Sequence, residues 1–320
     1  MDLSVIIVNR NTQALLRNCL LSLQRAGNAL STEIWVVDNA SGDGSVEMVR
    51  VEFPQVKLIV NQENLGFARA NNQALAQSAG RYCLLLNPDT VVPAGALDRL
   101  VQFMEDTLDA GVVGCAQIYP DGQWQITCHR AITLSREVFV ALGLAGIVRG
   151  LTDYGVHPDQ LRSPRSVDWV EGGVLLIHKT ALKAVGQMDE AFYMYVEDAD
   201  LCFRVRRAGF RVYYVPDVQV IHHRAQATGF IQRERRKHRV NAELLVALHQ
   251  SKAYYLRKHY GVWQEKVYQL VVRVYSLRKL GVGLVSYLLR AMERETWHDF
   301  ARAYQTLMAA DVGGSVQSAP

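Results

Sequence analysis

The sequence predicts an α/β fold: a doubly wound, mixed sheet with helices on both faces, followed by a C-terminal helical segment. Two observations predict it. Strand and helix signals alternate through the first hundred residues, and the chain reads as wholly helical from about residue 231. At 320 residues the chain exceeds one average domain, so we expect an α/β domain with an appended segment.

The first βα unit begins with a β-branched run over residues 3–8. Thr12 is placed to cap the following helix, whose apolar stripe ends before Gly27. Further strands are expected over residues 34–37, 56–60 and 82–86, and further helices over residues 46–53 and 67–79. The strand at 82–86 is apolar throughout, as expected where both faces of a parallel sheet are covered.

The signals weaken between residues 111 and 167. Residues 132–148 are apolar but contain Arg136 and Glu137, which favours a buried or interfacial helix over a membrane span. Strands are expected over 170–177 and 211–221, the second interrupted at Pro216-Asp217. Three helices follow, near 239–259, 263–280 and 282–304, separated by Gly261 and Gly281.

We therefore predict one domain over residues 1–230, divided into a nucleotide-binding half (1–110) and an acceptor half (111–230). Residues 231–320 form a basic helical region that contacts a membrane or forms an oligomer, with the last ten or so residues flexible. Residues 224–290 hold 14 Lys and Arg against three Glu, although the whole chain has a net charge of only +4. Such asymmetry indicates an anionic partner.

Composition places the protein in the cytoplasm, either free or peripheral at the inner face of the membrane. The apolar run at the N-terminus is too short for a signal peptide or a membrane span. The five scattered cysteines lack metal-ligand spacing and are expected to be reduced core thiols: Cys19, Cys83, Cys115, Cys128 and Cys202.

Polar residues follow three successive strands where each strand ends. They are Asn9-Arg10-Asn11, Asp38-Asn39 and Asn87-Pro88-Asp89. Ligands of such sheets bind beyond the carboxyl ends of the strands, so we expect a nucleotide here, with Asp38 on a ribose hydroxyl or base edge. An Asx-turn is the alternative for Asp38. Gly66 allows close backbone approach to the ligand, or simply caps a helix.

Asp89 is a candidate ligand for Mn²⁺ or Mg²⁺. It follows a buried strand directly, and carboxylate oxygens suit both ions; a strand-ending turn is the alternative. His222 or His223, at the end of another strand, supplies an imidazole to the same metal unless it is purely structural.

Asp198 is the candidate general base. Glu197, Asp198 and Asp200 crowd the start of a helix that ends at Gly209. Helix capping is the alternative, because acids are favoured in a first turn. Crowded carboxylates, however, raise one another's pKa, which tunes a base toward neutral pH.

Six collinear motifs over residues 3–229 resemble the inverting family 2 glycosyltransferases of the GT-A type, within them the bacterial rhamnosyltransferase-like branch of cell-surface polysaccharide assembly. The motifs are Ser4-Val5-Ile6-Ile7-Val8-Asn9, Val36-Val37-Asp38-Asn39-Ala40-Ser41, Glu63-Asn64-Leu65-Gly66-Phe67-Ala68-Arg69-Ala70-Asn71-Asn72, Leu85-Leu86-Asn87-Pro88-Asp89, Gly172-Gly173 and Tyr195-Val196-Glu197-Asp198-Ala199-Asp200-Leu201-Cys202-Phe203-Arg204. Asn87-Pro88-Asp89 departs from the usual Asp-x-Asp, and Ala225–Gly229 matches the family only loosely.

The resemblance implies inverting transfer of a sugar, rhamnose being one candidate, in a single displacement. It implies a UDP- or dTDP-linked donor and a glycan or lipid-linked acceptor. Asp198 and Glu197 would be catalytic, and Asp89 with His222 (or His223) would hold the metal. The donor would contact Val8, Asn9, Arg10, Asp38, Asn39, Asn64, Gly66, Phe67, Asn71, Asn87 and Asp89. The acceptor would contact Trp169, Gly172 and Gly173.

Two other functions compete with this one. A sugar-1-phosphate nucleotidyltransferase needs a glycine-rich loop after the first strand, and Asn9-Arg10-Asn11-Thr12 lacks the glycines. A noncatalytic nucleic-acid-binding module would use Arg233–Arg239 and the basic helices, but no nucleic-acid motif accompanies them, so we expect no nucleic-acid partner.

Aromatic side chains interleaved with basic ones, such as Tyr254, Tyr268 and Tyr275, suit a membrane interface, packing between helices or a homodimer equally well.

Overall fold

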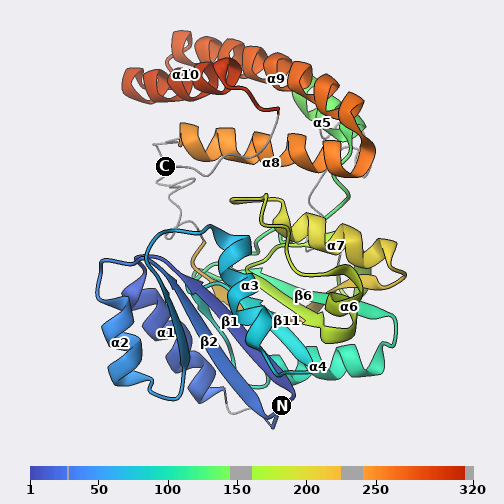
Figure 1. Cartoon of the computed structure of the whole chain (residues 1–320). Helices are drawn as coiled ribbons and strands as arrows, with labels where there is room; N and C mark the ends of the chain where they lie inside the picture. Colours follow the sequence, from blue (N-terminus) through green and yellow to red (C-terminus); the bar gives the residue numbers. More distant parts are fainter. Residues whose placement is uncertain (27–28, 145–160, 225–240, 314–320) are drawn as a thin grey trace. The chain divides into compact units, whose positions relative to one another are not determined.

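The computed structural model describes residues 1–26, 29–144, 161–224 and 241–313 (Figure 1). The chain divides into two compact units. The first comprises residues 1–131, 155–190 and 197–227, and the second comprises residues 132–154, 191–196 and 228–320. The predicted boundaries at 110 and 230 stay predictions. Arg233–Arg239, Ala225–Gly229 and the last seven residues lie outside the described part.

A nine-stranded mixed sheet forms the centre of the described part of the first unit, in the order β3-β2-β1-β4-β10-β6-β11-β5, with β8 paired to β11. Its strands are β1 (Leu3–Asn9), β2 (Thr32–Asn39), β3 (Lys57–Asn61), β4 (Tyr82–Leu86), β5 (Thr90–Val91), β6 (Ala110–Ile118), β8 (Arg165–Val167), β10 (Val174–His178) and β11 (Arg211–His222). The strands from β3 to β4 are parallel, whereas β10 runs antiparallel to both of its neighbours. A separate small sheet pairs β7 (Cys128–His129) with β9 (Trp169–Val170).

Helices cover both faces of the sheet, which confirms the predicted fold class. They are α1 (Gln13–Arg25), α2 (Ser45–Glu52), α3 (Phe67–Gln77), α4 (Ala96–Asp106), α6 (Lys179–Val185) and α7 (Glu197–Arg207). Side chains alternate between the two faces of a strand, so Val5 and Ile7 pack with α1, α2 and α4, whereas Ile6 packs with α3, α6 and α7. The two apolar cores hold the ends of the strands in fixed register.

Strand β11 corrects the predicted interruption at Pro216-Asp217. The strand runs unbroken from Arg211 to His222, and its pairing with β6 shifts register between Val215 and Gln219. Proline cannot donate to a sheet ladder and is tolerated at such a bulge. The bulge therefore lets the strand continue to His222.

The second unit is helical in its described residues. It contains α5 (Leu134–Leu142), α8 (Ala242–Tyr260), α9 (Val262–Leu288) and α10 (Arg294–Ala309). The predicted helix over 132–148 is shorter than expected, because Thr133 caps α5 and Gly143 ends it in the left-handed conformation; residues 145–148 lie outside the described part. Gly261 separates α8 from α9 as predicted.

The prediction that Gly281 ends a helix is wrong. Helix α9 continues through Gly281 and Gly283 to Leu288, since an interior glycine weakens a helix by only about 1 kcal/mol. Gly283 has a packing role: a β-carbon there would lie 2.7 Å from the rings of Trp297 and Phe300. Among the described residues, no helix is both long and apolar enough to span a bilayer.

Candidate active site

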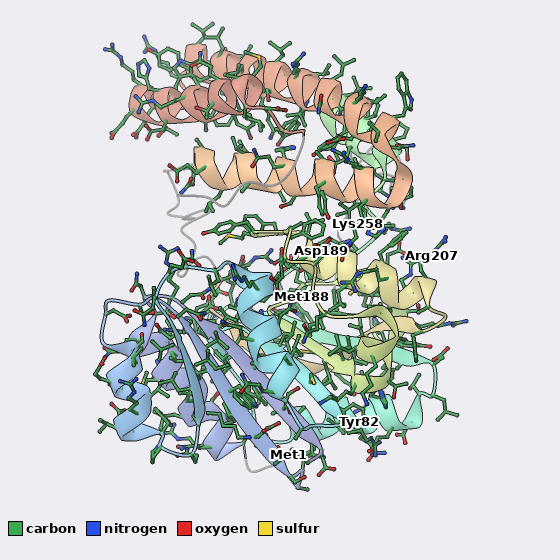
Figure 2. All side chains as sticks on the ribbon, in the orientation of Figure 1. Met1, Tyr82, Met188, Asp189, Arg207 and Lys258 are labelled. Atoms are coloured by element: carbon green, nitrogen blue, oxygen red, sulfur yellow. The ribbon has the colours of Figure 1, made fainter. Side chains whose placement is uncertain are left out.

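The polar strand ends meet at one edge of the sheet. Tyr82 begins β4 beside Met1 at the opposite edge (Figure 2), so Asn87 emerges where β1 and β2 also end. Asn9 is in register with Asp38, and its Nδ2 donates to Asp38 Oδ2 at 2.9 Å. The structure thus brings together the polar groups that the sequence placed at three separate strand exits.

Asp38 also forms the Asx-type turn that was its alternative role. Its Oδ1 accepts from the backbone N–H of Ser41 at 2.8 Å, and both Asn9 and Asp38 are buried. Thr12 donates to Asn9 Oδ1 at 2.6 Å, which fixes the orientation of the Asn9 amide. Of the flanking residues, Val8 is half-buried and Arg10 is exposed.

The loop before α3 lies beside the end of β2. Asn39 Nδ2 donates to the carbonyl of Gly66 at 3.2 Å, and Asn64 accepts from the Gly66 N–H at 3.1 Å. Gly66 has φ +80°, a conformation that glycine adopts without strain. It occupies the N-cap position of α3, which is the capping role that the sequence offered as an alternative. Asn71 Nδ2 donates back to the carbonyl of Phe67 at 2.9 Å. Asn39 and Asn64 thus hold Gly66 at the start of α3, and Asn71 lies one turn into the same helix.

Asp89 and His222 are neighbours. Thr90 pairs with His222 in the sheet, and Nε2 of His222 lies 3.1 Å from Oδ1 of Asp89, with both side chains buried. Nδ2 of Asn87 lies 3.4 Å from the same imidazole nitrogen. His223 instead donates its backbone N–H to the Asp89 carbonyl at 2.9 Å. The geometry therefore favours His222 over His223 as the partner of Asp89.

The pair fits a divalent metal. Asp89 Oδ1 is buried without a hydrogen-bond partner among the described residues, although buried polar atoms are usually satisfied. Two adjacent ligands of an octahedral ion at about 2.1 Å lie about 3 Å apart, close to the 3.1 Å observed. No cluster of three or more His, Cys, Asp or Glu side chains occurs among the described residues. The described residues that fit a metal here are therefore the Asp89–His222 pair.

Gly172 and Gly173 connect this pair to the carboxylate of Asp198. The Gly173 carbonyl accepts from the Asn87 N–H at 3.0 Å, and the Gly172 N–H donates to Asp198 Oδ2 at 2.9 Å. A β-carbon on Gly173 would lie 2.8 Å from Gln117 Oε1 and 3.2 Å from the His222 ring. Close packing therefore favours glycine at position 173, whereas a β-carbon at position 172 would make only ordinary contacts, the nearest 3.4 Å from the Phe67 ring.

Asp198 is a half-buried carboxylate with a raised pKa. Its Oδ1 accepts from the Ala199 N–H at 2.7 Å and its Oδ2 from Gly172. Burial raises the pKa of Asp198 to about 6, and the charge of Glu171 adds to the rise, while the two amides oppose it. The carboxylate is both oriented and poised near neutral pH, as a general base requires.

The neighbouring acids of α7 differ from Asp198. Burial and the charge of Asp198 raise the pKa of Glu197 well above its usual range. Asp200 is fully buried and accepts from Arg204 Nε at 2.8 Å, so it forms a structural ion pair. Tyr195 and Val196 precede the helix with φ of +69° and +71°, which costs on the order of 1–3 kcal/mol each for residues with a β-carbon. Such strain is typical of functional sites.

The sequence interpretation missed Glu171 and His129. Glu171 Oε1 accepts from Arg224 at 2.8 Å and lies 3.0 Å from His129 Nε2. Burial opposes the charge of Glu171, but the His129 contact and Arg224 lower its pKa overall. The His129 ring stacks on Trp169 at 4.1 Å, and Trp169 Nε1 donates to the Arg130 carbonyl. The position of Glu171 directly before Gly172 could have identified it as a site residue from the sequence. No sequence pattern identified His129.

The comparisons with known proteins define the class. The model of "Glycosyl transferase family 2" matches residues 4–151, and that of "Glycosyl transferase family group 2" matches residues 82–309. The chain belongs to glycosyltransferase family 2, and the predicted GT-A-type fold with C-terminal helices is confirmed. The sugar-1-phosphate nucleotidyltransferase and nucleic-acid-module alternatives give way to a glycosyltransferase.

Individual relatives place it in the rhamnosyltransferase-like branch. The N-acetylglucosaminyl-diphospho-decaprenol L-rhamnosyltransferase of Mycobacterium tuberculosis is 30% identical over 256 residues, covering 75% of this chain and 80% of the relative. The rhamnosyltransferase WbbL of Escherichia coli is 27% identical over 167 residues, covering 49% of this chain and 61% of the relative. A mannosyltransferase of Pyrobaculum calidifontis, solved with GDP-Man and Mn²⁺, shares the fold at a TM-score of 0.56 and 16% identity, covering 96% and 85%.

Proposed function

We propose that this glycosyltransferase transfers a hexose, with rhamnose the first candidate, from a UDP- or dTDP-linked donor to a lipid-linked glycan during cell-surface polysaccharide synthesis. The named substrates of the Mycobacterium tuberculosis relative support this choice. The single observation that carries the chemistry is Asp198, a carboxylate oriented by two backbone amides with its pKa raised to about 6.

The reaction is an inverting single displacement. The acceptor hydroxyl oxygen forms a bond to the anomeric carbon while the bond from that carbon to the diphosphate oxygen breaks. Asp198 is ionised at neutral pH and takes the proton of the acceptor hydroxyl. Burial and the charge of Asp198 raise the pKa of Glu197 well above its usual range, which disfavours a second negative charge beside the base.

Asp89 and His222 would hold Mn²⁺ or Mg²⁺ on the donor side. When bound, the ion supplies positive charge to the leaving diphosphate. The Asn9–Asp38 pair and the Asn39–Gly66 contact would orient the nucleoside, and their mutual hydrogen bonds keep these groups in place before the donor arrives. The donor contacts predicted from the sequence stay proposals on this basis.

Trp169, Gly172 and Gly173 would form the acceptor side. The indole is held by its stacking on His129 and by its hydrogen bond to Arg130, so it offers a rigid surface to a sugar ring. The Gly172 N–H that orients Asp198 lies in the same segment. Acceptor contacts and the base are therefore positioned by consecutive residues.

A transfer assay tests the proposal. Purified protein is incubated with Mn²⁺, a panel of UDP-, dTDP- and GDP-sugars and a polyprenyl-diphosphate-linked N-acetylhexosamine, and lipid-linked product is resolved by mass spectrometry. We expect product with one UDP- or dTDP-linked donor and an inverted anomeric configuration. Retention of configuration, or transfer only to a free nucleotide or nucleic acid, would contradict the proposal.

A further inference from the structure

Helix α9 carries a largely exposed apolar face within the described part of the second unit. Trp263, Leu270, Leu277 and Leu288 are 74%, 61%, 58% and 68% exposed, and Val274 and Leu284 are also exposed. Soluble proteins rarely leave a contiguous apolar strip of this length uncovered. The face extends along the whole helix, from Val262 to Leu288.

The six exposed apolar residues named above share one side of the helix. Successive residues of an α-helix are rotated by 100°, so the six apolar positions fall within an arc of about 80°. The opposite side of α9 is the one that packs inward, with Tyr268, Val272 and Ser276 buried. Of the aromatic residues expected at an interface, Tyr268 is buried between helices against His249 of α8. Another aromatic side chain, Trp263, lies at the start of the exposed face.

The charges beside this face are all positive. Lys266 and Arg273 are exposed and lie within about 60° of its centre by the same rotation. The one acid within α9, all of whose residues are described, is Glu265, which is buried on the other side 3.7 Å from Arg257. Beyond the helix the charges alternate, with Arg290 and Arg294 beside Glu293 and Glu295.

An apolar strip bordered by basic side chains matches an anionic bilayer surface. Apolar side chains enter the boundary between headgroups and acyl chains, while Lys and Arg extend to the lipid phosphates. A second copy of α9 would offer Lys266 and Arg273 no exposed acid of its own helix. Charge complementarity therefore favours lipid over self-association.

We propose that the face of α9 formed by Trp263, Leu270, Val274, Leu277, Leu284 and Leu288 binds an anionic membrane surface, with Lys266 and Arg273 on the headgroup phosphates. The proposal rests on the helical unit and holds whatever sugar the enzyme transfers. Its consequence for the proposed function is that the enzyme would meet a lipid-linked acceptor at the membrane.

Vesicle co-sedimentation of the full chain tests it, using phosphatidylcholine vesicles with and without phosphatidylglycerol. We expect binding to the anionic vesicles and little to the neutral ones. Leu270→Gln with Leu277→Gln should weaken binding tenfold or more, because the two changes remove apolar side chains that would enter the bilayer. Lys266→Gln or Arg273→Gln should each weaken vesicle binding about fivefold. Added salt should also weaken vesicle binding.

Leu108→Gln is the matched control, since Leu108 is 96% exposed in the first unit and should not affect binding. All these positions are exposed, and circular dichroism checks that each variant is folded. Equal sedimentation of wild type and the double leucine variant would overturn the proposal. So would a dimer in light scattering that the double leucine variant converts to monomer, because the face would then belong to a second copy. If the wild type binds anionic vesicles but transfers no sugar to the lipid-linked acceptor, the proposed function is contradicted and the membrane inference is not.

Discussion

The two carboxylates at the centre of the site, Asp89 and Asp198, are held in opposite ways. Asp89 is buried against the imidazole of His222, and its Oδ1 lacks a hydrogen-bond donor among the described residues. Asp198 is half-buried and accepts one backbone N–H on each oxygen. A buried oxygen without a donor suits a cation, whereas an oriented carboxylate with a raised pKa suits a proton. Under the proposed function, Asp89 would serve the leaving diphosphate of the sugar donor, and Asp198 would take the proton of the acceptor hydroxyl.

A large effect on turnover is expected from Asp89→Ala. Losing the carboxylate should remove the dependence of turnover on Mn²⁺ and lower turnover about a hundredfold or more, since metal stabilisation of a leaving group is worth several kcal/mol. Turnover is measured across a Mn²⁺ titration and after chelation with EDTA. Asp121→Ala, at an exposed turn, is the control and should titrate like the wild type. An unchanged Mn²⁺ response in Asp89→Ala would remove Asp89 from the metal side.

A smaller effect is expected from Glu171→Gln. The negative charge of Glu171 helps raise the pKa of Asp198, so its removal should lower that pKa and leave the base ionised at more acidic pH. The acid limb of kcat/KM, near pH 6 in the wild type, should move down by less than about one pH unit. Glu105→Gln, at an exposed pair with Arg81, should leave the profile in place. A shift toward higher pH would show that Glu171 acts otherwise.

Much of the fold and the strand-exit cluster could be predicted from the sequence, because both follow from local patterns. Apolar runs separated by turn residues predict strands, and the carboxyl ends of parallel strands meet at one edge. Asn9, Asp38 and Asn87 were found in this way, and the structure places them together. The relation of Gly172 to Asp198 needed the antiparallel insertion of β10, which no local pattern shows.

What could not be predicted depends on contacts between distant residues. The crowding of α7 acids was expected to raise the pKa of Asp198, yet burial and Glu171 are the main causes, and Asp200 is bound by Arg204. His129 reaches Glu171 across 42 residues of sequence. Gly281 was predicted to end a helix because glycine is common just after the last residue of a helix. In the structure α9 continues through it, as expected where tertiary packing stabilises a helix.

The most direct test of the central claim is Asp198→Asn, measured for both turnover and donor binding. We expect turnover to fall about 10²–10⁴-fold, the usual contribution of a general base, while calorimetry shows Mn²⁺-dependent binding of the nucleoside diphosphate close to that of the wild type. Asp217→Asn, at an exposed pair with Arg99, should change neither quantity. Near-wild-type turnover in Asp198→Asn would contradict the assignment of Asp198 as the base.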